Sequence, residues 1–335
     1  MRELLERIAG RRFFVIGDLY LDHYIFGSPQ RVSREAPVMV LEEDRHEHRL
    51  GGGAAPALAL AALGCQVAIG GVVGDDAEGR KLVELLGAAG IDAGHVHVDG
   101  SRPTTLKTRV VAEGFFLFPQ QLVRIDRQER APITPDVERR LSRSIRAADG
   151  EAVLVSDYRS GVATEAVVDA VRGFQQVRGA LTAVDSQGEL RKFAGFDLVK
   201  CNQGEAEAVL DAALDDDNLR PALLRALCAE LGCRCLVVTR GSAGASVVTA
   251  DDFQEVPAEN RSEIYDVTGA GDTVVAVMAA ALLAGGTAID AARLAQLAAG
   301  IVVRKWGNAQ ASAAELAAAA ALTPNPLYRL TGEGE

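Results

Sequence analysis

The chain has 335 residues, of which 48% are hydrophobic, and a formal net charge of −11. This length and hydrophobic content suffice for a large core, and α/β folds of this size often form one unit. So acidic a chain lacks the general basic surface that binds nucleic acids and anionic membranes, and we expect neither as a partner.

The N-terminus and the cysteines favour a soluble protein of the reducing cytoplasm. Residues 1–12 are charged and lead directly into a strand-like run, unlike a secretory signal. The longest apolar run, 273–284, is shorter than the ~20 residues that cross a bilayer. Five scattered cysteines do not resemble a disulfide framework. Cys233 and Cys235 have no histidine at metal-ligand spacing, so we expect no structural zinc.

Short apolar runs alternate with helical stretches along most of the chain. This alternation predicts βαβ units, and hence a three-layer α/β/α fold with a mostly parallel central sheet. The predicted strands are 13–16, 67–72, 152–155, 181–184, 198–201 and 236–239. The predicted helices are 54–63, 77–89, 135–147, 164–174, 219–231, 274–284 and 311–321, the last with Ser312 and Glu315 spaced as a capping box.

Two segments, about 19–45 and 103–127, break this rhythm. Their residues alternate as in antiparallel strands and carry few helix signals. We expect them to pair into a small sheet that projects from the core as a lid. Because exposed strand edges attract partners, we also expect a homodimer formed through the lid. We expect residues 1–325 to form one domain and residues 326–335 a loose tail.

Polar residues follow several predicted strands. In parallel α/β sheets the ligand site lies at the carboxyl ends of the strands. The residues found there are Asp18, Asp157, Asp185, Asn202 and Arg240. Asp18 and Asp22, which flank the exit of the first strand, either accept hydrogen bonds from sugar hydroxyls or belong to a solvated loop.

Two further clusters have both a functional and an ordinary interpretation. Gly51, Gly52 and Gly53 precede the helix 54–63, where they either let the backbone approach a ligand or make a turn. Lys107 and Arg109 are two residues apart on a lid strand and therefore face the same way. They either clamp a phosphate or decorate an exposed edge.

A polar, glycine-bearing turn and a helix start lie farther along the chain. The turn at Thr239, Arg240, Gly241 and Gly244 lies between two strand-like runs. It either wraps nucleotide phosphates or is an ordinary tight turn. Asn202 and Glu205, three residues apart, either organise a hydrated Mg²⁺ or cap the following helix.

Residues 266–273 read Asp-Val-Thr-Gly-Ala-Gly-Asp-Thr and precede an apolar helix. Gly269 and Gly271 let a ligand approach the backbone amides, and the helix N-terminus adds partial positive charge that stabilises a transferring phosphoryl group. Asp272 can accept a proton from an attacking hydroxyl. The alternative is a capped helix with an acid in its first turn. No Gly-x-Ser-x-Gly elbow or Walker A motif occurs in the chain.

Taken together in order, these clusters resemble the ribokinase, or PfkB-type, family of sugar kinases. The resemblance runs from about residue 13 to residue 316. It is carried by Gly17 and Asp22, then Gly51 and Gly52, Asn202 and Glu205, the turn 239–244, and the turn 266–272. Several stretches are also similar to D-glycero-D-manno-heptose 7-phosphate kinases, namely 31–38, 107–110, 120–126, 156–158 and 265–268.

This resemblance implies a ribokinase-like fold and a mechanism. Asp272 would be the base, and the amides of Gly269, Ala270 and Gly271 the anion hole for the γ-phosphoryl group of ATP. Mg²⁺ would bridge the phosphates. The resemblance also allows a monovalent cation such as K⁺. The chain ends where bifunctional members would begin a nucleotidyltransferase domain, so the kinase part alone is expected.

The resemblance assigns the remaining residues as well. Asn202 and Glu205 would organise the waters of Mg²⁺, and Asp266 and the Thr268 carbonyl would hold the monovalent cation. The nucleotide would lie against the turn 239–244. On the sugar side, the implied residues are Asp18, Asp22, Gly51, Gly52, Lys107, Arg109 and Asp157.

The sequence departs from the family pattern on the substrate side. A family Asn is replaced by Ala55 or Pro56, and two Lys positions by Gln187 and Ser160. The transfer turn is intact, so we expect a working kinase of a sugar or sugar phosphate, with heptose 7-phosphate as the leading substrate. One alternative is a kinase of an unphosphorylated sugar or a nucleoside. Another is a non-catalytic sugar- or nucleotide-binding regulator.

Overall fold

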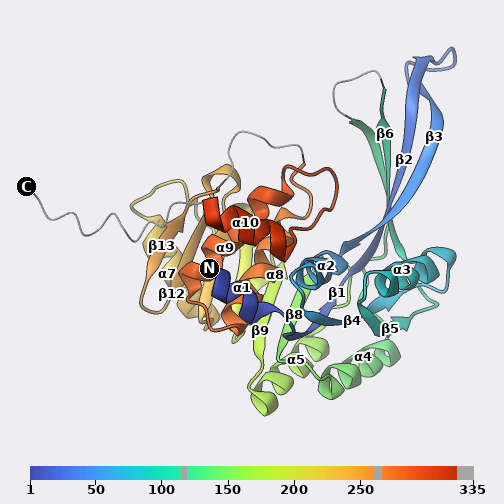
Figure 1. The fold of residues 1–335 in the computed structure, drawn as a ribbon. Coiled ribbons are helices and arrows are strands. Elements are labelled where there is room, and N and C mark those ends of the chain that lie inside the picture. The colour runs from blue at the N-terminus through green and yellow to red at the C-terminus, as the bar shows by residue number, and fades with distance from the viewer. Residues whose placement is uncertain (115–118, 260–265, 323–335) are drawn as a thin grey trace, which may run out of the picture.

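The computed structural model describes residues 1–114, 119–259 and 266–322. It has a large central sheet between two layers of helices, and a second sheet that projects from one end (Figure 1). The three-layer α/β/α fold predicted from the alternation of apolar runs is therefore confirmed. The predicted tail, 326–335, and residues 115–118 of the lid lie outside the described residues.

The central sheet has nine strands in the order β13-β12-β11-β10-β9-β8-β1-β4-β5. The seven strands from β5 to β11 are parallel, and β12 and β13 are added antiparallel at one edge. The strands are β1 (Arg12–Gly17), β4 (Gln66–Val73), β5 (Asp92–Val98), β8 (Ala152–Asp157), β9 (Leu181–Ser186), β10 (Leu198–Asn202), β11 (Cys235–Thr239), β12 (Ala245–Thr249) and β13 (Phe253–Val256).

Helices cover both faces of this sheet and bury two hydrophobic clusters against it. The first cluster lies under α1 (Arg2–Ile8), α2 (Ala54–Ala62), α3 (Ala77–Ala88), α8 (Ala270–Leu283), α9 (Ala288–Val302) and α10 (Ala313–Leu322). The second lies under α4 (Pro135–Ala147), α5 (Glu165–Arg178), α6 (Gln203–Leu210) and α7 (Arg220–Leu231). Short 3₁₀ turns, η1 (Leu190–Phe193) and η2 (Gly241–Ala243), complete the set.

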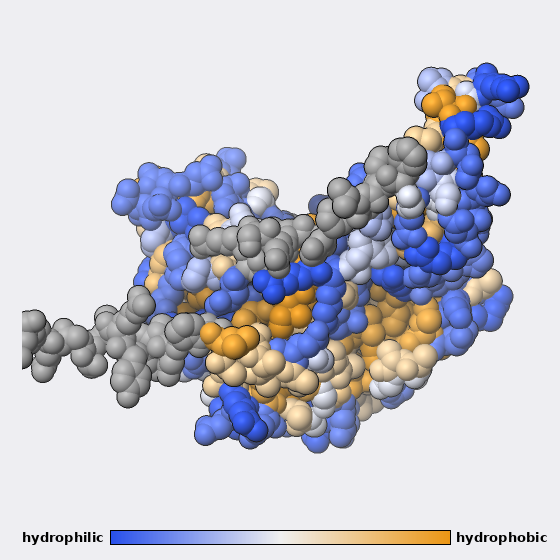
Figure 2. Space-filling model, turned by 45° about the horizontal axis from the view of Figure 1, so that its top comes forward, coloured by the Kyte–Doolittle hydropathy of each residue, from blue (hydrophilic) through white to orange (hydrophobic). Residues whose placement is uncertain are grey.

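The lid is the second sheet, with strand order β3-β2-β6-β7. Its strands are β2 (Leu19–Val32), β3 (Met39–Gly52), β6 (Thr105–Ala112) and β7 (Gln120–Arg127). The two predicted segments do pair, but their join is parallel, between β2 and β6; only the pairs β2–β3 and β6–β7 are antiparallel. Figure 2 shows a largely hydrophilic lid with apolar side chains gathered near its far end.

The predicted strands and helices all form, with ends that shift by a few residues. One local interpretation changes: Gly51 and Gly52 are the last residues of the lid strand β3, and only Gly53 serves as the cap of α2. The Ser312–Glu315 capping box also forms, with the Ser312 amide 2.9 Å from the Glu315 carboxylate. Within the described ranges, no helix is long and apolar enough to cross a membrane.

Candidate active site

The predicted catalytic turn lies where α8 begins. Gly269 is the N-cap of α8 and has φ +79°, a left-handed conformation that favours glycine. A side chain at Gly269 would also collide with the Asn308 carboxamide. The first amides of a helix have no partner within the helix, and they carry its partial positive charge. The Ala270 amide donates to the Val267 carbonyl at 3.2 Å, so this predicted anion-hole donor already has a partner within the turn.

Asp266 holds the start of the turn in place. One carboxylate oxygen accepts the Thr268 amide at 2.9 Å, and the other accepts the Gly307 amide at 3.0 Å. The turn is thus bonded to a loop 41 residues farther along the chain. This carboxylate and the Thr268 backbone are the pair that the family resemblance assigns to a monovalent cation.

Asp272, the predicted base, is buried in the first turn of α8 and only 8% exposed. The Tyr158 hydroxyl lies 3.0 and 2.9 Å from its two carboxylate oxygens. Burial and the nearby negative charge of Asp185 raise the pKa of Asp272 to about 7, although Lys200 and the Tyr158 hydrogen bond oppose them. A carboxylate with this pKa can accept a proton near neutral pH.

Lys200 and Asp185 form a buried ion pair beside the turn. The Lys200 ammonium lies 2.7 Å from the Asp185 carboxylate, and Lys200 is only 6% exposed. Burial disfavours the ammonium, but the Asp185 charge outweighs it and raises the pKa of Lys200. A Cβ at Gly271 would lie 2.8 Å from the ammonium nitrogen, which explains why this position is glycine. The pair brings a fixed cation to the predicted anion hole.

Sequence reasoning gave Tyr158 and Lys200 no role in the site. Lys200 did carry a usable signal, because it is a charged residue inside an otherwise apolar strand, β10. Tyr158 carried none, because its partner Asp272 is 114 residues away in the chain. Both are brought to the site by the parallel sheet, whose strand ends converge there.

The base of the lid forms the other side of the site. Asp22 and Arg109 are buried and form an ion pair at 2.6 Å. A Cβ at Gly51 would lie 2.5 Å from the Asp22 carboxylate, so glycine is needed for the strand to pass. Lys107 places its ammonium 3.9 Å from the centre of the Tyr20 ring and 5.5 Å from that of Tyr158.

These contacts separate the two lid cations that the sequence grouped together. Arg109 is neutralised by Asp22, whereas the Lys107 ammonium lies over aromatic rings, where a cation is stabilised. Burial lowers the pKa of Lys107, and Asp22 partly offsets this. The edge-decoration alternative is wrong for Arg109, which is 9% exposed, and Lys107 is half-buried.

Asp18 shapes the loop that carries Tyr158. Its carboxylate accepts the amides of Tyr158, Ser160 and Val162 at 2.8, 3.0 and 3.2 Å. Burial outweighs these hydrogen bonds and raises the pKa of Asp18 to about 6. At 2% exposure, Asp18 does not belong to a solvated loop, and neither does Asp22 at 4%.

Asp157, the last residue of β8, contacts β9 and η1. Asp157 accepts the Ser186 hydroxyl at 2.9 Å and lies 3.4 Å from the Lys192 ammonium. Ser160 is hydrogen-bonded to the Tyr20 hydroxyl at 2.8 Å and to Gln128, at the end of the lid, at 2.5 Å. A small hydroxyl at Ser160 therefore ties the lid to the core. Ala55 and Pro56 are buried in α2. The backbone amide of Gln187 donates to the Asp157 carbonyl.

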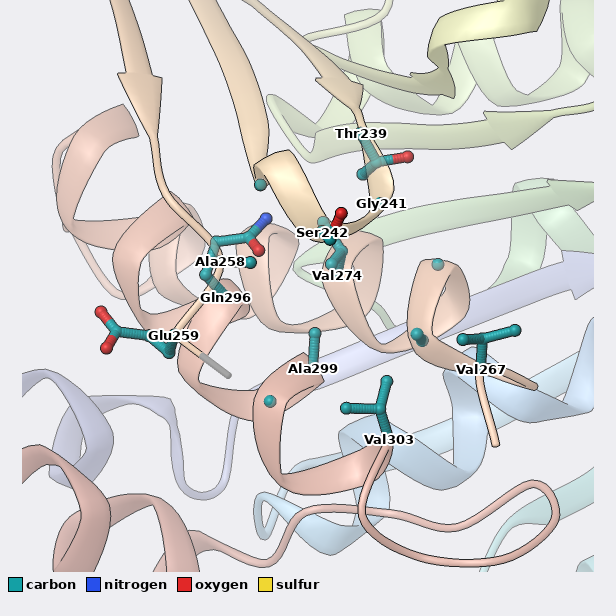
Figure 3. Close-up of a pocket in the computed structure, with 14 residues that line it drawn as sticks. Thr239, Gly241, Ser242, Ala258, Glu259, Val267, Val274, Gln296, Ala299 and Val303 are labelled. Carbon is teal, nitrogen blue, oxygen red and sulfur yellow. The ribbon is translucent and has the colours of Figure 1, made fainter. Parts of the chain in front are cut away.

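A pocket opens on the other side of the catalytic turn (Figure 3). It encloses about 800 Å³, its open mouth included. The turn after β11 forms one wall, the start of α8 the second, and α9 the third. Its lining includes Thr239, Gly241, Ser242, Gly244, Ala258, Glu259, Val267, Ala270, Gly271, Val274, Gln296, Ala299, Gly300 and Val303. Small and apolar residues predominate, as in sites for flat organic groups.

The predicted nucleotide residues divide into two groups. Thr239, Gly241 and Gly244 line this pocket, but the Arg240 guanidinium is bonded to Glu255 at 2.8 Å. Asn202 and Glu205 form a reciprocal capping box on α6, with bonds of 2.9 and 2.7 Å. The helix-cap interpretation is thus confirmed.

The magnesium interpretation of Asn202 and Glu205 stays a prediction. Burial and the Asp185 charge raise the pKa of Glu205, as they do for Asp272, so negative charge is concentrated here. No group of three or more His, Cys, Asp or Glu residues that could hold a metal occurs within the described part of the chain. An ion bound mainly through water and phosphate oxygens needs no such group.

Comparison with known proteins agrees with this geometry. Residues 13–314 match the profile of the pfkB family carbohydrate kinases. The chain belongs to the pfkB family of carbohydrate kinases. It is 38% identical over 326 residues to the bifunctional protein HldE of Pelobacter propionicus, covering 96% of this chain and 66% of that protein. It is 40% identical over 306 residues to HldE of Geobacter sulfurreducens, covering 90% and 61%. The kinase thus spans less than two thirds of these relatives.

Solved structures show the same fold at low sequence identity. Phosphofructokinase-2 from Escherichia coli, in complex with potassium, has a TM-score of 0.77 and 21% identity, covering 93% of the kinase and 98% of that chain. Arabidopsis thaliana ribokinase, complexed with ribose and ATP, has a TM-score of 0.70 and 18% identity, covering 93% and 98%. These likenesses confirm the ribokinase-like fold.

Proposed function

We propose that this kinase transfers the γ-phosphoryl group of ATP to a hydroxyl of a sugar phosphate, with heptose 7-phosphate as the first candidate. The observation that carries the proposal is Asp272, a buried carboxylate with a pKa of about 7. It lies at a helix N-terminus between the lid and the pocket. The similarity to HldE over 96% of the chain supports the choice of sugar.

Each group then has a role in phosphoryl transfer, in which positioning and electrostatics do most of the catalysis. Asp272 accepts the proton of the attacking hydroxyl. The amides of Gly269 and Gly271 and the Lys200 ammonium stabilise the negative charge of the phosphoryl group, whereas the Ala270 amide already donates to Val267. Tyr158 fixes the Asp272 carboxylate. The pocket beside Thr239 and Gly244 accepts the nucleotide.

Two cations fit this arrangement. Burial raises the pKa values of both Glu205 and Asp272, and the Asp185 charge adds to the effect, as expected for carboxylates that lie close together. A Mg²⁺ ion near Asn202 and Glu205 would relieve that crowding and neutralise phosphate charge. Asp266 and the Thr268 carbonyl would hold a monovalent ion such as K⁺. A cytoplasmic location stays a prediction.

The lid also supports a homodimer. Every residue of β7 is exposed, including Leu122, Val123 and Ile125 at 43, 47 and 61%. An exposed apolar edge strand favours pairing with a second chain. We expect light scattering to give the mass of a dimer for the wild type and of a monomer for Ile125→Lys.

A second candidate, a kinase of an unphosphorylated sugar or nucleoside, is favoured by the Asp22–Arg109 pair. In that pair Asp22 neutralises Arg109, one of the two cations predicted to bind a substrate phosphate. An ATP-consumption assay over heptose 7-phosphate, other phosphosugars, free sugars and nucleosides separates the two candidates. The Asp272→Asn variant, assayed in parallel, is the control for contaminating kinases. Turnover confined to free sugars or nucleosides would overturn the first candidate, and none with any acceptor would overturn both.

A further inference from the structure

The loop between α9 and α10 lies between the lid and the core (Figure 1). Trp306, the only tryptophan in the chain, is in this loop. Its ring centre lies 5.0 Å from that of Tyr24 and 5.3 Å from that of Phe26, both on the lid strand β2. With Val111 of β6 they form a small hydrophobic cluster separate from the core. Trp306 thus packs a large side chain of the core against the lid.

Arg49 of β3 adds to the contact between Trp306 and the lid. Its guanidinium carbon lies 4.8 Å from the centre of the Trp306 ring and 5.1 Å from that of Tyr24. One nitrogen is 3.5 Å from the Trp306 carbonyl, and another is bonded to Glu47 at 2.7 Å. Cation–π contacts of this kind hold two elements in a fixed orientation. A side chain at Gly307, where φ is +75°, would collide with the guanidinium.

The next two residues contact the catalytic turn. The Gly307 amide donates to the Asp266 carboxylate at 3.0 Å. The Asn308 side chain donates to the Leu50 carbonyl at 2.9 Å, and its oxygen faces the Cα of Gly269 so closely that a Cβ there would clash. Leu50 immediately precedes Gly51 on the lid strand. Three consecutive residues thus join the lid, the sugar side and the catalytic turn.

We propose that residues 306–308 are a positioning segment through which the lid sets the Gly269 and Gly271 amides for phosphoryl transfer. A change in the lid angle displaces Tyr24, Phe26 and Arg49, which carry Trp306 with them. The adjoining Gly307 and Asn308 then shift Asp266 and Gly269. A contiguous chain of packed and hydrogen-bonded residues of this kind can carry coupling between two sites, and its test is a variant that interrupts the chain. The proposal rests on the proposed function for its consequence, but the linkage itself exists without substrate.

Arg49 and Arg45 offer a matched pair of variants. Both are arginines of β3 that lie over an aromatic ring of the lid and are bonded to Glu47. Arg45 lies over Phe26 and pairs with Glu113, whereas Arg49 alone of the two contacts Trp306. Arg49→Ala therefore removes a direct contact with Trp306, whereas Arg45→Ala removes a similar cation–π contact and ion pair of the lid but no direct contact with Trp306.

The first measurement is amide hydrogen exchange over residues 266–275 in the free protein. We expect exchange about tenfold faster in Arg49→Ala and Trp306→Ala, and unchanged in Arg45→Ala and Trp306→Phe. Wild-type exchange in both alanine variants would overturn the proposal. Equal acceleration in Arg45→Ala would also overturn it, because general loosening of the lid would then be the cause.

The second measurement is steady-state kinetics with the best acceptor from the substrate panel. We expect Arg49→Ala and Trp306→Ala to lower kcat about tenfold at an unchanged KM for ATP, and Trp306→Phe to restore kcat. A residue that only stabilised the fold would reduce the amount of active protein and would not be rescued selectively. If the wild type phosphorylates nothing, the proposed function fails, and the exchange experiment still decides the linkage.

Discussion

The two sides of the active site balance their charges differently. Around the catalytic turn, the carboxylates of Asp185, Glu205 and Asp272 lie near the ammonium of Lys200, and Lys107 of the lid acts more weakly on Asp272. Three carboxylates thus face two ammonium groups. At the base of the lid, Asp22 and Arg109 cancel each other. In the proposed function, the core side would hold the base and the cations, and the lid side would hold the sugar.

The charges around the catalytic turn bear on how the reaction runs, whereas the charges at the base of the lid bear on which sugar binds. Burial, together with the Asp185 charge, raises the pKa of Asp272 to about 7, which suits the base of the proposed function. The balanced lid leaves Lys107 as the cation that can select a phosphorylated sugar. Removing charges from each side in turn tests the contrast.

The largest effect is expected on the core side, from Asp272→Asn. Removing a general base lowers turnover by about 10²–10⁴. The amide keeps the size of the side chain and can still be bonded by Tyr158, so binding of a non-hydrolysable ATP analogue should change little. Calorimetry and a steady-state assay measure the two quantities. Retained turnover would contradict the assignment of Asp272 as the base.

The next largest effect is expected from Lys200→Met, as a loss of unfolding free energy. The substitution leaves the Asp185 carboxylate unpaired in a largely buried site, which destabilises a protein by about 3–5 kcal/mol. Chemical denaturation measures the loss of unfolding free energy. Lys81→Met is the control, because Lys81 pairs with Glu84 on the surface, where such a pair contributes about 0–1 kcal/mol. Equal losses in the two variants would show that Lys200 is not the charge partner described.

On the lid side, Lys107→Met should raise the KM for a phosphorylated sugar about tenfold, because one charge-assisted contact is lost. The KM for an unphosphorylated analogue should stay the same. Arg124→Met removes a neighbouring lid cation that pairs with Asp126 at the surface, and it should leave both constants unchanged. If Lys107→Met affects neither sugar, the substrate phosphate does not bind at Lys107, and the second candidate function gains support.

The sequence predicts those parts of the fold and of the site that are encoded by neighbouring residues in the chain. The strands of the core are contiguous apolar runs, and the catalytic turn is a contiguous octapeptide, so both are visible in the sequence. The partly exposed β5, Asp-Ala-Gly-His-Val-His-Val, lacks such a run and was not predicted. The roles of Tyr158 and of residues 306–308 depend on contacts between distant segments, which no local pattern encodes.

Tyr158→Phe gives the smallest and most specific test, because it changes the pKa of Asp272 without removing the base. The base acts when deprotonated, so kcat/KM of the wild type should rise with pH through about 7 and then level off. The Tyr158 hydrogen bond lowers the pKa of Asp272, and its loss should therefore move this rise to higher pH. At pH 9 the variant should approach wild-type activity, since Asp272 is then deprotonated in both. A pH profile with an unshifted acidic limb would mean that the titrating group is not Asp272.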